Sequence, residues 1–264
     1  MKHMQVFDYH ISPKLKKGLV FKSFYFQGET KEEKTLGDLF IVAELSDSLS
    51  CDTKILNDLS NSIKKEFFQS SENSKQALTE ALKKGNHFLE DLSNKGNVRW
   101  LGNLNFTAVL LKDFSIYFSK TGNIHILLLR GLDYHDIAEN LESQQPSNNK
   151  PFYPFSNVAS GQLSEGDKII ILTQDIFDFF HAYLAEKIMK HSILTPKTLA
   201  KMFKEKKEEM EQISGIFFLI FINQIRHRRL HFPKIKFPLI KIKKEVRLII
   251  VLILILLLSY LIFK

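Results

Sequence analysis

The chain has 264 residues, of which 44% are hydrophobic and 25% charged, so it is long enough for one domain of about 200 residues and an additional segment. Its single cysteine, Cys51, excludes an internal disulfide bond and a metal site built from several thiolates. The net charge of +8 is concentrated in residues 224–247, which contain nine Lys or Arg residues and one acid. Because Lys264 is also positive, residues 1–223 carry a net charge of −1, which argues against a nucleic-acid-binding domain.

The first part of the chain predicts two strands followed by two long helices. We assign no element to residues 1–14, which also lack an apolar run long enough for a signal peptide. Residues 18–26 alternate as a strand does, and residues 38–44 form a short apolar run that fits a buried strand. Apolar residues then recur at helical spacing across residues 52–94, where we expect two helices with a break at Gly85.

The middle of the chain predicts more β-structure. Short turns at Lys112-Asp113 and Thr121-Gly122 separate three apolar runs, which indicates an antiparallel meander. The strands of this meander are expected at residues 105–112, 114–119 and 123–130. A polar stretch from about residue 139 to 160 is expected to be a surface loop.

The next segment predicts a strand, two helices and a final buried strand, in the ranges 167–172, 175–190, 196–210 and 213–222. Thr195 and Pro196 are suited to begin the second of these helices. Antiparallel strands followed by paired helices favour an α+β fold. We therefore expect residues 1–223 to form a two-layer antiparallel β-sandwich flanked by helices.

The C-terminal end predicts a membrane anchor. Residues 248–263 contain no charged residue, Gly or Pro, and residues 246–263 would form a helix of about 27 Å, close to the thickness of a bilayer core. We predict a single transmembrane helix at 246–263, which contacts membrane lipid, and a basic juxtamembrane linker at 224–245. The positive-inside rule then places the N-terminal domain of this tail-anchored chain in the cytoplasm.

The basic residues beside this helix fit attraction to anionic lipid and orientation of the anchor. They are Arg226, Arg228, Arg229, Lys234, Lys236, Lys241, Lys243, Lys244 and Arg247.

Four stretches of residues 10–223 resemble, in order, the metal-dependent protein phosphatases of type 2C, including bacterial forms. The most specific is SGQLSEGDKIIILTQDIFD at 160–178, which is similar to the family's Gly-Asp turn, apolar strand and Thr-Asp-Gly motif. The others are LFIVAELSD (39–47), NFTAVLLKDFSIYFSKTGNIHILLLRG (105–131) and EQISGIFFLI (211–220). The resemblance implies two magnesium or manganese ions, held by Asp residues at strand ends, that activate water for attack on phosphoserine or phosphothreonine.

The same resemblance implies that the metal site has lost most of its carboxylates. In chain order, the family's metal-site positions are occupied here by Glu44, Asn123, Gln174, Asp175, Glu211 and Gln212. A pair of dications needs several carboxylates to offset its mutual repulsion. We therefore expect no catalytic residue and no resident cofactor, and Glu44 and Asp175 would be the ligands of any metal that binds.

Three functional hypotheses remain. The preferred one is a membrane-anchored pseudophosphatase that acts in cytoplasmic binding or signalling through an unidentified protein partner, without contact to nucleic acid. The second is a divergent serine/threonine phosphatase that uses magnesium or manganese held by Glu44, Asp175 and a further acid, Asp47 or Asp52. These last two residues also fit a solvated loop and a helix N-cap. The third is a tail-anchored α+β domain unrelated to the phosphatases.

Overall fold

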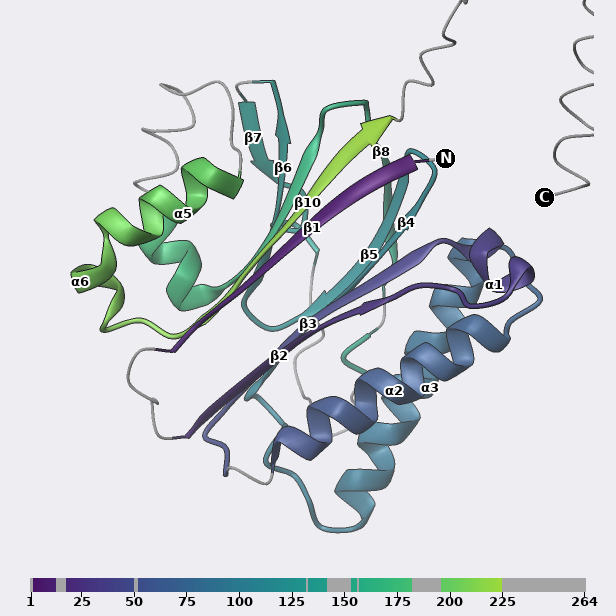
Figure 1. Ribbon diagram of the computed structural model, residues 1–264. Helices are drawn as coiled ribbons and strands as arrows, with labels where there is room; N and C mark the ends of the chain where they lie inside the picture. Colours follow the sequence, from purple (N-terminus) through teal and green to yellow (C-terminus); the bar gives the residue numbers. More distant parts are fainter. Residues whose placement is uncertain are drawn as a thin grey trace, which may run out of the picture. The chain divides into compact units, whose positions relative to one another are not determined.

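The structure, a computed structural model, describes residues 2–12, 18–49, 52–131, 133–141, 153–155, 157–181 and 196–224. All of these residues belong to one compact unit, Met1–Ile225. Two five-stranded antiparallel sheets form the centre of this unit, and helices flank them (Figure 1). The α+β class and the two antiparallel sheets expected from the sequence are confirmed.

The first sheet, sheet A, joins the beginning of the chain to the end of the described region. Its strand order is β1-β10-β9-β6-β7. The strands are β1 (Lys2–Ile11), β10 (Gly215–Gln224), β9 (Lys168–Thr173), β6 (Ile124–Arg130) and β7 (Asp133–Asp136). Strands β1 and β10 pair along their whole length, with Lys2 opposite Gln224 and Ile11 opposite Gly215.

The second sheet, sheet B, has the order β2-β3-β4-β5-β8. Its strands are β2 (Leu19–Phe26), β3 (Asp38–Ser46), β4 (Leu104–Lys112), β5 (Ser115–Thr121) and β8 (Ala159–Gln162). Strands β3 and β4 are covered on both faces, which explains why most of their residues are apolar and buried.

Three apolar layers hold the unit together. Between the sheets, Phe40 and Val42 of sheet B pack with Ile171 and Phe218 of sheet A. On the outer face of sheet B lie α2 (Thr53–Gln69) and α3 (Ser74–Asn94), whose buried stripes join the alternate residues of β3 and β4 (Figure 1). On the outer face of sheet A lie the helical residues 174–181, α5 (Pro196–Glu205) and α6 (Lys207–Met210).

The expected meander is wrong. Strand β4 pairs with β5, but β5 pairs on its other side with β8, and β6 pairs with β7 and β9 in the other sheet. The Gly122-Asn123 link therefore carries the chain from one layer of the sandwich to the other. A short polar turn between two apolar runs is equally compatible with a hairpin and with such a crossing.

The break expected at Gly85 is also wrong. Helix α3 continues through this glycine, and the two helices are separated instead by residues 70–73. A Cβ atom at Gly85 would lie 3.1 Å from Cδ1 of Ile63, a buried residue of α2. The glycine therefore allows the two helices to pack closely. The expected helix at 196–210 is interrupted at Lys206, between α5 and α6.

Strands β1, β7 and β8 and the short helix α1 (Lys31–Leu36) were not predicted. A sequence signal for α1 was available, because Thr30 and Glu33 form a reciprocal capping box at its start. No helix in the described ranges is long and apolar enough to cross a membrane. The transmembrane helix predicted at 246–263 and the linker at 224–245, apart from Gln224, lie outside these ranges.

Candidate functional site

Three of the positions that resemble metal-site positions lie at one end of the two sheets. Glu44 is opposite Asn105 in the register of β3 and β4. In sheet A, Ile124 is opposite Thr173, which places Asn123 and Gln174 at adjacent strand ends. Glu44 follows Phe40 and Val42 on the face of β3 that packs between the sheets, and its side chain is only 7% exposed.

The side chain of Asn105 joins two of these positions. Its Nδ2 donates to Oε1 of Glu44 at 2.9 Å, and its Oδ1 accepts from the backbone N–H of Asn123 at 2.8 Å. Gly122 is required in this turn because its φ is 70° and a Cβ atom there would clash with Oδ1 of Asn105. The Asn105 amide therefore connects the end of sheet B to the start of β6.

The side-chain amide of Gln174 is bound by groups of the same unit. Its Oε1 lies 2.9 Å from Nε2 of His125, and its Nε2 donates to Oδ1 of Asp178 at 2.7 Å. The His125 ring stacks on Phe177 with ring centroids 3.6 Å apart and planes 9° from parallel. Gln174 is thereby held at the start of the helix that covers sheet A.

Asp136 of β7 contacts the other ring nitrogen of His125. Its Oδ2 lies 2.6 Å from Nδ1 of His125, and its Oδ1 accepts from the backbone N–H of Ala138 at 2.9 Å. Burial tends to raise the pKa of Asp136, but the hydrogen bonds from His125 and from the backbone outweigh it and lower the pKa below its ordinary value. The result is a continuous series of contacts from Asp136 through His125 and Gln174 to Asp178, which ties the helix to β6 and β7.

The remaining predicted positions are Asp175, Glu211 and Gln212. Asp175 is half-buried in the first turn of the helix that follows β9. Glu211 and Gln212 are exposed between α6 and β10, and Glu211 lines a separate hollow of about 630 Å³ together with Tyr9 and Phe203.

The two further acids considered for a shifted site have local roles. Asp47 is exposed and has a φ of 48°, the left-handed conformation that is uncommon for residues other than glycine but tolerated by Asp. Asp52 occupies the N-cap position of α2 as expected, but its side chain makes no capping hydrogen bond. Its carboxylate instead accepts from the backbone N–H of Leu49 at 2.8 Å.

These donors do not fit a pair of magnesium or manganese ions. In the part of the chain that the structure describes, no three His, Cys, Asp or Glu side chains are grouped so that they could hold a metal ion. The partner of Glu44 at this end is the Asn105 amide, and the position after β9 is the Gln174 amide bound to His125. Amides supply no negative charge.

Sequence reasoning missed Asn105, His125 and Asp136. A signal was present for two of them, because Asn105 and His125 are polar residues within mostly apolar strands. Such residues need a partner when they are partly buried.

No protein-family model matches the sequence, and no curated protein matches it significantly. Solved structures share its fold. The SiaA-PP2C domain of Pseudomonas aeruginosa is 13% identical, with a TM-score of 0.57 over 83% of this chain and 86% of its own. The PP2C phosphatase domain of SpoIIE from Bacillus subtilis, solved with a fragment of its regulatory domain, is 17% identical, with a TM-score of 0.55 over 84% of this chain. The RsbU and RsbW domains of a Mycobacterium tuberculosis protein are 12% identical, with a TM-score of 0.52 over 83% of this chain.

The chain spans 64% of the SpoIIE structure and 61% of the Mycobacterium tuberculosis structure. At these identities the likeness concerns the fold alone. The described unit has the two-sheet fold of the type 2C phosphatase domains.

Proposed function

We propose that this chain is a membrane-anchored pseudophosphatase: a domain with the type 2C phosphatase fold and impaired catalysis that acts by binding in cytoplasmic signalling. The observation that carries the proposal is the set of hydrogen bonds made by the side chains of Glu44 and Gln174. Glu44 accepts a hydrogen bond from the Asn105 amide, and Gln174 is held between His125 and Asp178. Hydrogen bonds within the protein thus occupy positions at which the family places metal ligands.

The energetics of this arrangement favour a metal-free site. Glu44 would be the one carboxylate that these bonds place beside a dication there, and its Oε1 already accepts from the Asn105 amide. Coordination by Gln174 would require breaking its contact with His125 and would add no charge to offset the second ion. We therefore expect the fold to be stable without magnesium or manganese.

The membrane part of the proposal rests on the sequence. The apolar segment 246–263 is the anchor, and the basic residues of 224–247 lie on its cytoplasmic side and contact anionic lipid. The net charge of −1 on residues 1–223 favours a protein partner over nucleic acid for the N-terminal domain. Deletion of 246–263 should move the protein from the membrane fraction to the soluble fraction.

The test of impaired catalysis uses the full chain in detergent. Manganese binding is measured by calorimetry, and hydrolysis of p-nitrophenyl phosphate and of a phosphoserine peptide is measured in parallel. We expect no saturable manganese binding and no turnover above that of Glu44→Ala. The control is Glu208→Ala, which removes an exposed carboxylate of α6.

Manganese-dependent turnover that is lost in Glu44→Ala but kept in Glu208→Ala would overturn the proposal. It would support the alternative, a divergent metal-dependent serine/threonine phosphatase that has rebuilt its ligands. Turnover that is unchanged in both variants would point to a contaminating phosphatase and would leave the expected absence of activity intact.

A further inference from the structure

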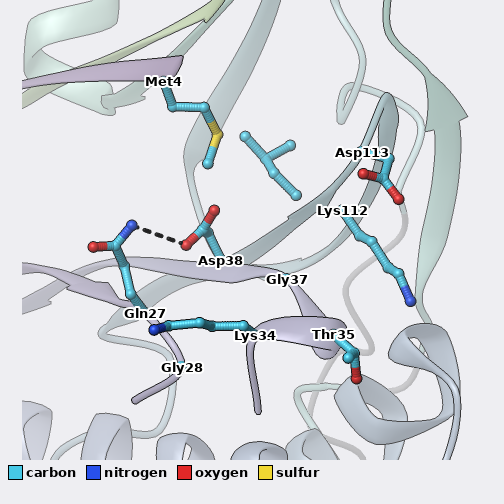
Figure 2. A pocket seen from close by; sticks show the side chains of 10 residues that line it. Met4, Gln27, Gly28, Lys34, Thr35, Gly37, Asp38, Lys112 and Asp113 are labelled. Atoms are coloured by element: carbon cyan, nitrogen blue, oxygen red, sulfur yellow. Dashed lines mark hydrogen bonds between the residues drawn. The ribbon is translucent and has the colours of Figure 1, made fainter. Parts of the chain in front are cut away.

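A hollow of about 510 Å³ lies at the opposite end of β3 from Glu44 (Figure 2). Asp38, which lines it, is separated from Glu44 by six residues of strand, or about 20 Å at about 3.3 Å per residue. The volume falls within the range of about 300 to 1,000 Å³ that is typical of small-molecule sites. The walls come from β1, from the segment around α1, and from the end of β4.

Two glycines fix the shape of this hollow. Gly37 has a φ of 108°, and a Cβ atom there would lie 2.6 Å from the backbone oxygen of Leu111. A Cβ atom at Gly28 would lie 2.5 Å from the backbone carbon of Glu33. The segments before and after α1 are therefore packed closely against their neighbours, so the hollow is built into the fold.

The charged side chains around the hollow include both signs. Lys34, Lys112 and Asp113 have no ion pair or side-chain hydrogen bond with any residue that the structure describes. Asp38 is half-buried and accepts from Nε2 of Gln27 at 3.2 Å. With two lysines and two aspartates, the lining has no net charge.

The negative charge of Asp38 contributes to a raised pKa of a nearby tyrosine. The pKa of Tyr25 is raised to about 12, first by burial and then by the charge of Asp38. Figure 2 shows Asp38 facing Met4, with Gln27 on one side and with Lys112 and Asp113 on the other. The hollow therefore combines a negative pole, positive groups and the apolar side chains of Met4 and Leu111.

We propose that this hollow binds a small zwitterion with a primary ammonium group and a carboxylate or phosphate group. The ammonium group contacts Asp38, the acidic group contacts Lys34, whose ammonium group lies on the Gln27 side of Asp38 (Figure 2), and the connecting carbon atoms lie against Met4 and Leu111. A simple anion would be repelled by Asp38 and Asp113, and a simple cation would be repelled by the two lysines. The site is separate from the Glu44 end of the sheets and does not depend on the function proposed there.

The experiment follows the methyl group of Met4 by NMR. The full 264-residue chain is labelled with ¹³C-methyl methionine, and the Met4 signal is assigned with Met4→Leu. Common amino acids and O-phosphoethanolamine are titrated separately, with acetate and methylammonium as singly charged controls. Met210, which lines a different hollow, is the internal reference.

We expect a saturable shift of the Met4 signal with a zwitterion and none with the singly charged controls. Saturation by an amino acid identifies a free metabolite, whereas saturation by O-phosphoethanolamine alone identifies a lipid headgroup. Asp38→Asn and Lys34→Gln should weaken the binding at least tenfold. Lys83→Gln, at an exposed lysine of α3, should leave it unchanged.

Two results would overturn the proposal. One is the absence of a saturable Met4 shift with every zwitterion tested. The other is a shift that persists with unchanged affinity in Lys34→Gln, because this variant removes the charge of an exposed side chain of α1 and keeps its buried residue, Leu36. Equal shifts of Met4 and Met210 would also count against it, since they would indicate a general change of the protein.

Discussion

Asn105 donates its side-chain amide to Glu44 across 2.9 Å at the end of the sheets where the family's metal site would lie. The same amide accepts from the backbone N–H of Asn123, so one side chain joins both layers of the sandwich at this point. A neutral amide therefore holds together the strand ends of the two sheets. The site residues therefore stabilise the fold directly.

Replacing Asn105 should reveal this contribution. Asn105→Ala removes the donor to the buried Glu44 and the acceptor for Asn123, and it should lower the free energy of unfolding by about 1–3 kcal/mol. Urea denaturation followed by circular dichroism measures the change. Asn103→Ala is the control, because Asn103 makes an exposed bond to the backbone of Arg99. An equal effect of the two substitutions would contradict the assigned role.

The buried carboxylate of Asp167 should depend on Arg130. Asp167 is only 2% exposed, and the guanidinium group of Arg130 contacts both of its oxygens at 2.7 to 3.3 Å. In Arg130→Ala the Asp167 carboxylate keeps its hydrogen bond from the Ser164 backbone N–H but loses the guanidinium group. We therefore expect the free energy of unfolding to fall by about 2–4 kcal/mol. The matched control is Lys83→Ala, which breaks an exposed pair with Glu80 and should cost less than about 1 kcal/mol. The melting temperatures of both variants are measured by thermal unfolding. Similar melting temperatures would refute the predicted dependence of Asp167 on Arg130.

Gly37 should be far less replaceable than Gly96. Both have positive φ, 108° and 85°, but a Cβ atom at Gly37 meets the backbone of Leu111 whereas one at Gly96 meets nothing within 4 Å. Gly96→Ala should therefore cost about 1 kcal/mol for its backbone conformation alone, and Gly37→Ala should cost more. Chemical denaturation decides this. If Gly37→Ala were no more destabilising than Gly96→Ala, the close contact with Leu111 would be wrong.

The pKa of Asp136 predicts a pH dependence. Because hydrogen bonds lower this pKa in the folded protein, the carboxylate stabilises the fold above the unfolded pKa of Asp, about 3.9, and this contribution is lost as pH falls through the lower folded value. Asp136→Asn should be less stable near neutral pH and should lose less stability on acidification. Melting temperatures from about pH 3 to pH 7 measure this.

Asp133→Asn is the control for that measurement, since Asp133 is an exposed residue of the same strand. A variant at Asp136 with the acid sensitivity of the wild-type protein would show that other carboxylates are responsible. Loss of the contact with His125 should also loosen the helix at 174–181, which hydrogen exchange would detect.

Local patterns located the buried strands well, and they failed where distant residues decide the structure. Strands β3, β4 and β9 are apolar because both of their faces are covered, so composition alone reveals them. Strand β1 is paired with the far end of the chain, and its neighbour in the sheet cannot be inferred from its own residues. The strands that pair with β5 and β6 likewise depend on residues far away in the chain.

The sequence named positions for a candidate site but not their contacts. The resemblance to phosphatase motifs named Glu44, Asn123 and Gln174. The register places Asn123 and Gln174 at adjacent strand ends of sheet A, and the Asn105 side chain links Asn123 to Glu44 of sheet B. It could not show that Gln174 binds His125, because that contact joins residues separated by 49 positions in the chain. Glu211 resembled a site position but is exposed beside a different hollow.

The pairing of β1 with β10 has a consequence for synthesis on the ribosome. The first strand emerges early, yet the strand that lies between it and the rest of sheet A comes from residues 215–224. Sheet B, whose strands end at residue 162, can assemble while β1 still has an open edge. The nascent chain must therefore keep an incomplete sheet from pairing with other chains until nearly the whole domain has been made, which makes late folding and a need for chaperones expected properties of this protein.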